Sequence, residues 1–134
     1  MKPGPTLTGL TGEWYGFLAV REIRFQRCTG CGRWRHPPRV GCAGCGSPDW
    51  SWERSSGRGE VYSWTVTHQA VHPDWAADAP YAIVVVALEE PGVRLVSGWD
   101  GPLSALGVGV GVVVGFQERE DGLVVPVCQV NVAS

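Results

Sequence analysis

The sequence predicts a small, mainly β fold with a metal-binding ribbon in its amino-terminal half. The chain has 134 residues, enough for one domain or two small subdomains that share a core. Twenty valines occur beside three phenylalanines and one methionine, and β-branched side chains favour strands. The 19 glycines and 10 prolines indicate many turns. Four of the five cysteines form two close pairs, which is typical of a metal site.

Residues 1–12 are predicted to be a flexible tether, because they contain two prolines and three glycines among simple side chains. Residues 13–57 are predicted to hold a helix and the ribbon, and residues 58–134 the β part. The helix should be short and amphipathic, with side chains recurring at helical spacing at Trp14, Phe17, Leu18 and Arg21.

A predicted strand over residues 23–27 leads into the first of the two cysteine pairs, Cys28/Cys31 and Cys42/Cys45. Two intervening residues let both sulfurs of a pair point at one centre, and the adjacent glycines permit the tight turn. Four thiolates suit a structural zinc ion with no open position for a substrate, and a single iron is the alternative. Two disulfides or a redox dithiol fit poorly, since no secretory signal is visible.

The segment between the cysteine pairs is rich in arginine and contains Arg33, Trp34, Arg35 and Arg39. Ten of the eleven cationic residues are arginines, which bind phosphate and carboxylate groups in bidentate fashion. One interpretation is that these arginines hold phosphates while Trp34 stacks on a base. The other is that Trp34 and the neighbouring prolines cover the metal centre, with the arginines in solvent.

Five strands are predicted in the second part of the chain, separated by turns and loops. A loop over residues 72–80 separates the first two strands, and residues 102–106 form one helical turn. Cys128 is expected to be a buried small side chain and not a nucleophile. The predicted strands cover residues 61–67, 81–88, 93–99, 108–116 and 123–130, and glycines in the fourth leave room for a bulge.

Several function classes are excluded or disfavoured. The longest apolar run has seven residues, too short for a membrane helix, so we expect a cytoplasmic protein. No set of catalytic nucleophile, base and acid can be assembled from the sequence. The net charge is −2, but residues 1–60 carry +4 and residues 61–134 carry −6. An acidic β part argues against the alternative function, a single-stranded nucleic-acid-binding module.

The order of these parts resembles a family of acyl-CoA-associated proteins that pair a rubredoxin-like zinc ribbon with a five-stranded OB-fold barrel. The resemblance covers nearly everything between residues 13 and 130. The matching segments are residues 26–32, 37–46, 56–66, 79–81, 107–110 and 125–127. Where the family pattern suggests an aromatic residue, this sequence has Cys128.

The resemblance implies an accessory subunit of a thiolase-fold enzyme of the lipid-transfer type. Such subunits help to hold or channel a CoA thioester, and some partner or are fused to hotdog-fold enoyl-CoA hydratases. A steroid side-chain retro-aldolase complex contains a similar domain. The resemblance and the arginine content together place the CoA phosphates near Arg33, Arg35, Arg39 or Arg58, where ribbon and barrel meet.

Seven tryptophans in so small a chain predict more aromatic surface than one core can absorb. We therefore expect a protein interface that includes Trp14 and Trp75. The alternative is that Trp14, Trp50, Trp52 and Trp75 all pack internally where ribbon and barrel meet.

Overall fold

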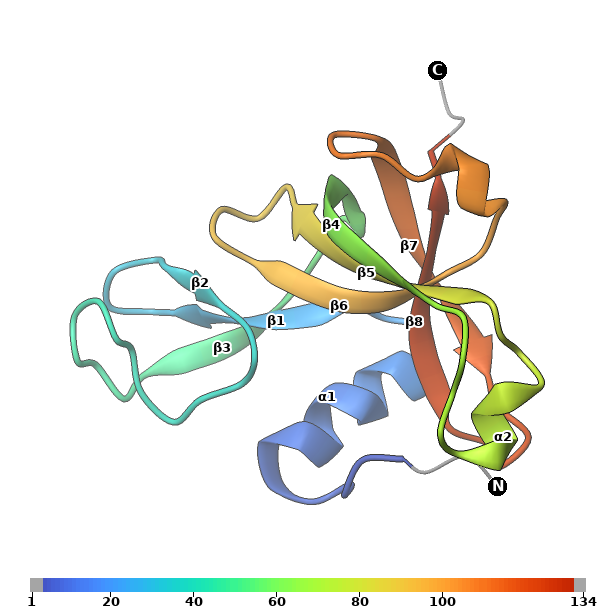
Figure 1. Ribbon diagram of the computed structural model, residues 1–134. Helices are drawn as coiled ribbons and strands as arrows, with labels where there is room; N and C mark the ends of the chain where they lie inside the picture. The colour runs from blue at the N-terminus through green and yellow to red at the C-terminus, as the bar shows by residue number, and fades with distance from the viewer. Residues whose placement is uncertain (1–3, 132–134) are drawn as a thin grey trace.

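The computed structural model of the protein describes residues 4–131 and contains a small three-stranded sheet beside a closed barrel (Figure 1). The small sheet is antiparallel and has the order β2–β1–β3. Helix α1 (Gly9–Ala19) precedes it, and its strands are β1 (Arg24–Cys28), β2 (Trp34–Arg35) and β3 (Trp50–Arg54). We call residues 24–54 the ribbon, because they contain this sheet and both cysteine pairs.

Five strands form the barrel in the order β4–β5–β6–β8–β7, and pairing of β4 with β7 closes it. All neighbouring strands are antiparallel except β6 and β8. The mainly β fold with five barrel strands is therefore confirmed. The strands are β4 (Arg58–Thr67), β5 (Tyr81–Leu88), β6 (Arg94–Trp99), β7 (Gly111–Glu118) and β8 (Val124–Val130).

Helix α1 begins before the end of the predicted tether. The prediction for residues 1–12 is wrong from Gly9 onward, where the helix starts; residues 1–3 lie outside the described part of the chain. Glycine and threonine have low helix propensity, which is why composition indicated a tether. Burial overrides that propensity, because Trp14 and Leu18 of the helix are 5% and 0% exposed.

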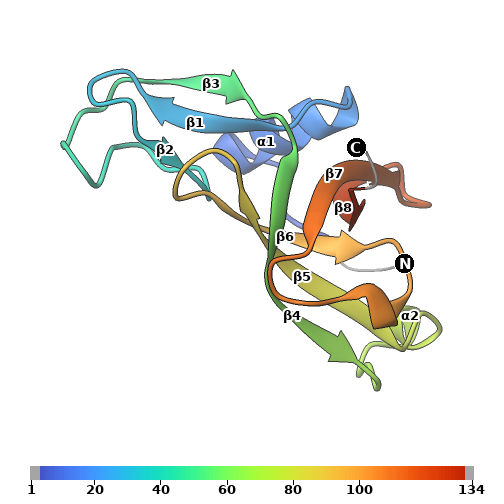
Figure 2. The same ribbon diagram turned by 90° about the horizontal axis from the view of Figure 1, so that it is seen from above.

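One hydrophobic core joins the helix, the ribbon and the barrel. Residues along β5 are alternately half-buried and buried, as expected for a barrel strand with one face inside. Leu18 of α1 and Phe25 of β1 are fully buried in the same core. The ribbon is therefore attached to the barrel through apolar side chains at its base. Figure 2 shows that β3 leads into β4, so residues 55–57 form a short linker between ribbon and barrel.

Several connections differ from the sequence-based expectation. Strands β2 and β3 were not predicted, and the loop over residues 72–80 contains a short helix, α2 (Pro73–Ala76). The predicted helical turn is present as a 3-10 helix, η1 (Leu103–Ala105). Strand β7 begins only after Gly109, whose φ of 86° turns the chain, and the β-bulge lies in β4 instead. Within the described residues, no helix has the length and apolar character needed to cross a membrane.

Candidate zinc centre and cationic pocket

The paired cysteines lie in two similar tight turns, and each turn ends in a glycine with a left-handed backbone. Gly32 has a φ of 78° and Gly46 a φ of 76°. Their backbone N–H groups donate to the carbonyl oxygens of Cys28 and Cys42, each at 2.8 Å. Glycine adopts this conformation without steric cost, which explains why a glycine follows each pair.

The four cysteine sulfurs form a cluster that fits a tetrahedral zinc ion. All four lie within 4.8 Å of one another. The Sγ atoms of Cys28 and Cys45 are 3.6 Å apart, and those of Cys31 and Cys42 are also 3.6 Å apart. Zinc–sulfur bonds of about 2.3 Å require sulfur–sulfur distances of about 3.8 Å in a tetrahedron. The structure thus brings the four predicted ligands together, and structural zinc is the cofactor that they fit.

Backbone N–H groups stabilise the thiolate form of two of these ligands. The N–H of Gly44 donates to Cys42 Sγ at 3.3 Å. Hydrogen bonds from the N–H groups of Cys45 and Gly44 lower the pKa of Cys42 to about 6. A backbone hydrogen bond from Cys31 likewise lowers the pKa of Cys28. The turns therefore favour the charged form of the thiol that binds a metal.

Cys128 is buried in β8, as predicted, and takes no part in the cluster. Its Sγ is 3.3 Å from the carbonyl oxygen of Gly98, to which it donates. Burial raises the pKa of this thiol, which makes it a poor nucleophile.

A cationic pocket of about 210 Å³ lies beside the zinc centre. Three of the arginines predicted to bind phosphate line it together. All lining residues come from the ribbon except one, which belongs to the turn between β5 and β6. The lining residues are Arg33, Trp34, Arg35, His36, Arg39, Cys42, Ala43 and Gly92.

The fourth predicted phosphate ligand, Arg58, does not line this pocket. Its Nε donates to Glu89 Oε1 at 3.2 Å, so its charge is already paired with a carboxylate on the barrel. The structure therefore divides the predicted arginine set into a group of three and one separate residue.

Gln26, which sequence reasoning did not single out, binds two of the arginines that line the pocket. Its side chain is fully buried. Its Oε1 accepts hydrogen bonds from Arg35 Nε at 2.8 Å and from the backbone N–H of Arg39 at 2.7 Å. No sequence signal identified it, because alternation along β1 places Gln26 on the face opposite the buried Phe25.

His36 is the second unpredicted residue of the pocket. Its ring centroid is 5.0 Å from that of Trp14 and 5.1 Å from that of Phe25. Burial lowers the pKa of His36 to about 4, so the imidazole is neutral at pH 7.

Five buried side-chain nitrogens have no hydrogen-bond partner among the described residues. Three belong to Gln26 (Nε2), Arg35 (Nη1) and His36 (Nδ1), and the other two are Trp14 Nε1 and Arg24 Nε. Buried polar groups nearly always have a partner, so such a cluster points to a ligand or ordered water. The two nitrogens of Gln26 and Arg35 are donors, which suits an anionic ligand.

The guanidinium group of Arg33 lies close to Gly44 in the second cysteine turn. A Cβ atom built on Gly44 would be 2.7 Å from Arg33 Cζ and 2.9 Å from its Nε. The absence of a side chain at Gly44 thus makes room for the guanidinium group at the pocket.

The two tryptophans predicted at an interface lie in different environments. Trp14 is 5% exposed and belongs to the hydrophobic core, so it offers no surface to a partner and that prediction is wrong. Trp75 is half-buried in α2, with its ring 5.5 Å from that of Tyr81. It lines a second hollow of about 380 Å³ together with Val71, a fully exposed side chain.

Two family models match the chain in succession. The model described as the rubredoxin-like zinc ribbon domain of ChsH2 matches residues 17–51, and that of the ChsH2 C-terminal OB-fold domain matches residues 52–117. A solved structure described as the Ltp2-ChsH2(DUF35) aldolase contains a similar chain. That chain is 34% identical with a TM-score of 0.86, and the match covers 95% of this chain and 98% of the other.

Curated relatives are longer than this chain. A probable enoyl-CoA hydratase alpha subunit of Thermomonospora curvata is 35% identical over 95% of this chain, but the match spans 39% of the relative. A DUF35 domain-containing scaffold protein of Methanocaldococcus jannaschii is 37% identical over 52% of this chain and 48% of its own length. A DUF35 protein structure from Sulfolobus solfataricus shares the fold, with a TM-score of 0.60 at 16% identity. It covers 91% of this chain and 85% of that chain.

Proposed function

The chain belongs to the ChsH2 (DUF35) family of zinc-ribbon and OB-fold proteins, and from this we propose that it is a non-catalytic scaffold subunit of a thiolase-fold acyl-CoA enzyme. The names of two similar proteins support the proposal. One is described as a DUF35 domain-containing scaffold protein, and the other belongs to a structure described as the Ltp2-ChsH2(DUF35) aldolase. We propose a lipid-transfer-type thiolase homologue as the partner. A hotdog-fold hydratase, fused or separate, is a second partner, in keeping with the hydratase relative.

The chemistry of the site supports a role without catalysis. Four thiolates complete the coordination of a zinc ion and leave no position for a substrate or a reactive water. Zinc in such a site stabilises the fold of the ribbon. The thiol of Cys128 is buried. We therefore assign the carbon–carbon bond chemistry to the partner, and we propose retro-aldol cleavage of a steroid side-chain CoA thioester in the cytoplasm as the reaction.

The cationic pocket is the observation that carries the proposed ligand, a CoA thioester. CoA has a diphosphate and a separate phosphate, and guanidinium groups bind such groups with paired hydrogen bonds. Arg33, Arg35 and Arg39 converge on a space of about 210 Å³, too small for the whole of CoA and sufficient for a phosphate-bearing part of it. Trp34 adds an aromatic surface on which an adenine ring can stack. The acyl end would then extend out of the pocket toward the partner enzyme.

Calorimetry on the assembled complex tests the ligand. We expect an Arg33/Arg35/Arg39 triple alanine variant to bind acyl-CoA at least tenfold more weakly than the wild type. The matched control replaces Arg21, Arg54 and Arg94, exposed arginines that do not line the pocket, and so makes the same change in net charge. Equal losses of acyl-CoA affinity in both variants would mean that only net charge matters, and they would refute the proposal that the pocket binds CoA.

Sedimentation tests the partnership. Co-expression with a lipid-transfer-type thiolase homologue should give one heteromeric species, with activity that neither protein has alone. Trp75→Ala should weaken that species, since a half-buried aromatic ring that lines an apolar hollow is typical of an interface anchor. Val108→Ala is the control, because Val108 is an exposed apolar residue elsewhere on the barrel. Two independent boundaries for the wild-type proteins would exclude the scaffold role.

A further inference from the structure

We propose that the turn between β5 and β6, residues 89–92, is a polar lock that fixes the angle between ribbon and barrel and so sets the shape of the cationic pocket. One end of this turn holds the linker, residues 55–57, through two carboxylates. Its other end lines the pocket through Gly92. The pocket's role as an anion site rests on the proposed function, whereas the lock itself does not.

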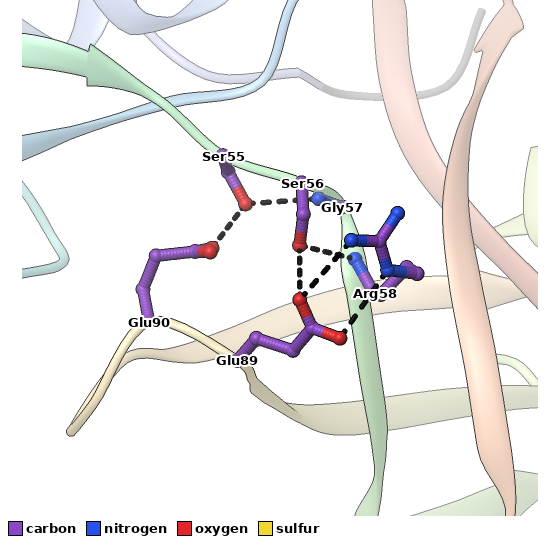
Figure 3. Close-up of polar contacts among 6 residues, drawn as sticks. All are labelled: Ser55, Ser56, Gly57, Arg58, Glu89 and Glu90. Atoms are coloured by element: carbon purple, nitrogen blue, oxygen red, sulfur yellow. Dashed lines mark hydrogen bonds and ion pairs between the residues drawn. The ribbon is translucent and has the colours of Figure 1, made fainter.

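Two consecutive serines of the linker each bind one of two consecutive glutamates (Figure 3). The hydroxyl of Ser55 donates to Glu90 Oε1. The hydroxyl of Ser56 donates to Glu89 Oε2 at 2.9 Å. Hydrogen bonds to carboxylates are stronger than bonds between neutral groups. The linker is thus tied to the turn at two adjacent positions.

Each serine hydroxyl is also oriented by the backbone of the linker. Ser55 Oγ accepts a hydrogen bond from the N–H of Gly57 at 3.0 Å, and Ser56 Oγ accepts one from the N–H of Arg58 at 3.2 Å. Because a hydroxyl has a single hydrogen to donate, that hydrogen is directed at the carboxylate. Figure 3 shows the two chains of hydrogen bonds side by side, each leading from a backbone N–H through a serine hydroxyl to a glutamate carboxylate.

Glu89 holds a third connection, to the first residue of the barrel. Its carboxylate binds the Arg58 guanidinium at 3.2 Å, and its backbone N–H donates to the Arg58 carbonyl at 2.9 Å. Hydrogen bonds from Ser56 and Arg58 lower the pKa of Glu89, so the carboxylate stays charged at neutral pH.

The linker is fixed on its barrel side as well. Gly57 has a φ of 74°, and its carbonyl oxygen accepts a hydrogen bond of 2.8 Å from the N–H of Val114 in β7. At the base of the ribbon, by contrast, Leu18 and Phe25 make apolar contacts, which favour burial but have little directional preference. Hydrogen bonds depend steeply on angle. The Ser55 N–H also donates to the Ile23 carbonyl oxygen at 2.8 Å, next to β1. The serine–glutamate pairs add two directional contacts to this one and are suited to fixing the ribbon in one orientation.

A variant that opens the lock without changing any charge separates geometry from electrostatics. Ser55→Ala with Ser56→Ala removes both hydroxyl donors and keeps every arginine and glutamate. Ser51→Ala is the matched control, because Ser51 donates to Glu53 at 2.9 Å entirely within β3. Cobalt(II) in place of zinc gives a paramagnetic centre in the ribbon, and its pseudocontact shifts on barrel amides report the angle between the two parts.

We expect the double variant to reduce or reorient the barrel pseudocontact shifts and to bind inorganic pyrophosphate roughly threefold to tenfold more weakly than the wild type, with Ser51→Ala unchanged in both. Glu89→Gln strengthens the test. If only charge mattered, removing an acid near the pocket would tighten pyrophosphate binding, whereas the lock predicts weaker binding.

Unchanged pseudocontact shifts in the double variant would refute the lock. If pyrophosphate fails to bind the wild type while the shifts still change, the lock stands and the anion site of the proposed function fails. Weaker pyrophosphate binding with unchanged shifts would also overturn the proposal, because the ribbon would then have kept its angle.

Discussion

The side-chain carbonyl oxygen of Gln26 accepts a hydrogen bond of 2.7 Å from the backbone N–H of Arg39. Gln26 belongs to β1, in the fully buried part of the ribbon, whereas Arg39 lies in the long loop between the cysteine pairs. The same oxygen also accepts a hydrogen bond from Arg35. The buried amide of Gln26 therefore positions two of the three arginines of the pocket. It binds Arg39 through that residue's backbone N–H and Arg35 through its guanidinium group.

Replacing Gln26 with leucine should destabilise the protein and weaken anion binding together. The substitution leaves the Arg39 N–H and Arg35 Nε without their acceptor, and an unsatisfied buried donor costs about 1–3 kcal/mol. Urea denaturation should show this loss in the free energy of unfolding, and pyrophosphate affinity should fall. Gln117→Leu on an exposed position of β7 is the control and should change neither quantity. Unaltered pyrophosphate binding by Gln26→Leu would show that the arginines hold their places without Gln26.

Loss of one zinc ligand should unfold the ribbon and leave the barrel mainly folded. Cys31→Ser removes an exposed ligand of the cluster, and zinc binding contributes on the order of 10 kcal/mol in small ribbons. Elemental analysis should give one zinc per chain in the wild type and much less in the variant, with collapsed amide dispersion for ribbon residues. Cys128→Ser should keep its zinc. A zinc-free wild type with a folded ribbon would contradict this account.

Local patterns were sufficient to predict much of the fold. The spacing of the cysteines identified the zinc ligands, and short apolar runs separated by turn residues identified the barrel strands, because both signals lie within a few residues. Strands β2 and β3 escaped detection because their side chains are all half-buried or exposed, so they lack alternation. The start of α1 at Gly9 depended on burial against the barrel, which composition does not reveal.

The candidate site was predicted only in part, because its supporting contacts are not local. Arg33, Arg35 and Arg39 all lie in the segment between the two cysteine pairs, so their gathering could be expected from the sequence. The partner of Arg58 is Glu89, 31 positions away, and its pairing depends on how β4 and β5 align. Gln26 and His36 look like surface residues in the sequence, and only the packing of α1 and β1 buries them.

The depressed pKa of His36, about 4, predicts a pH-dependent loss of stability. In the unfolded chain an imidazole has a pKa of about 6.5, so the unfolded state binds more protons than the folded state between these two values. Stability is therefore fully present above pH 6.5 and falls as the pH drops toward 4. The loss in the free energy of unfolding should be on the order of 1–3 kcal/mol. This is less than the full pKa shift would give, because the ring is not completely buried.

Comparison with His36→Phe isolates this contribution from acid release of zinc. Phenylalanine fits the aromatic surroundings of Trp14 and Phe25 and does not titrate. As the pH falls from 6.5 to 5, the free energy of unfolding should decrease more for the wild type than for the variant. The His36 imidazole resonances should keep their neutral chemical shifts over this range. Resonances that titrate with a midpoint near 6.5 would contradict the predicted burial.

Substituting alanine for Gly44 should displace Arg33 with little effect on stability. The new Cβ would lie 2.7 Å from Arg33 Cζ, closer than such contacts allow, and the group that must move is the far end of a flexible side chain. Arg33 would turn away from the pocket, so pyrophosphate affinity should fall several-fold, as charge-assisted hydrogen bonds are lost. The midpoint of urea denaturation should change by little. Gly41→Ala is the matched control in the same loop, because its Cβ would meet only an ordinary contact with the Ser47 carbonyl at 3.9 Å. If both variants bind pyrophosphate as the wild type does, Arg33 makes no contribution to the anion site.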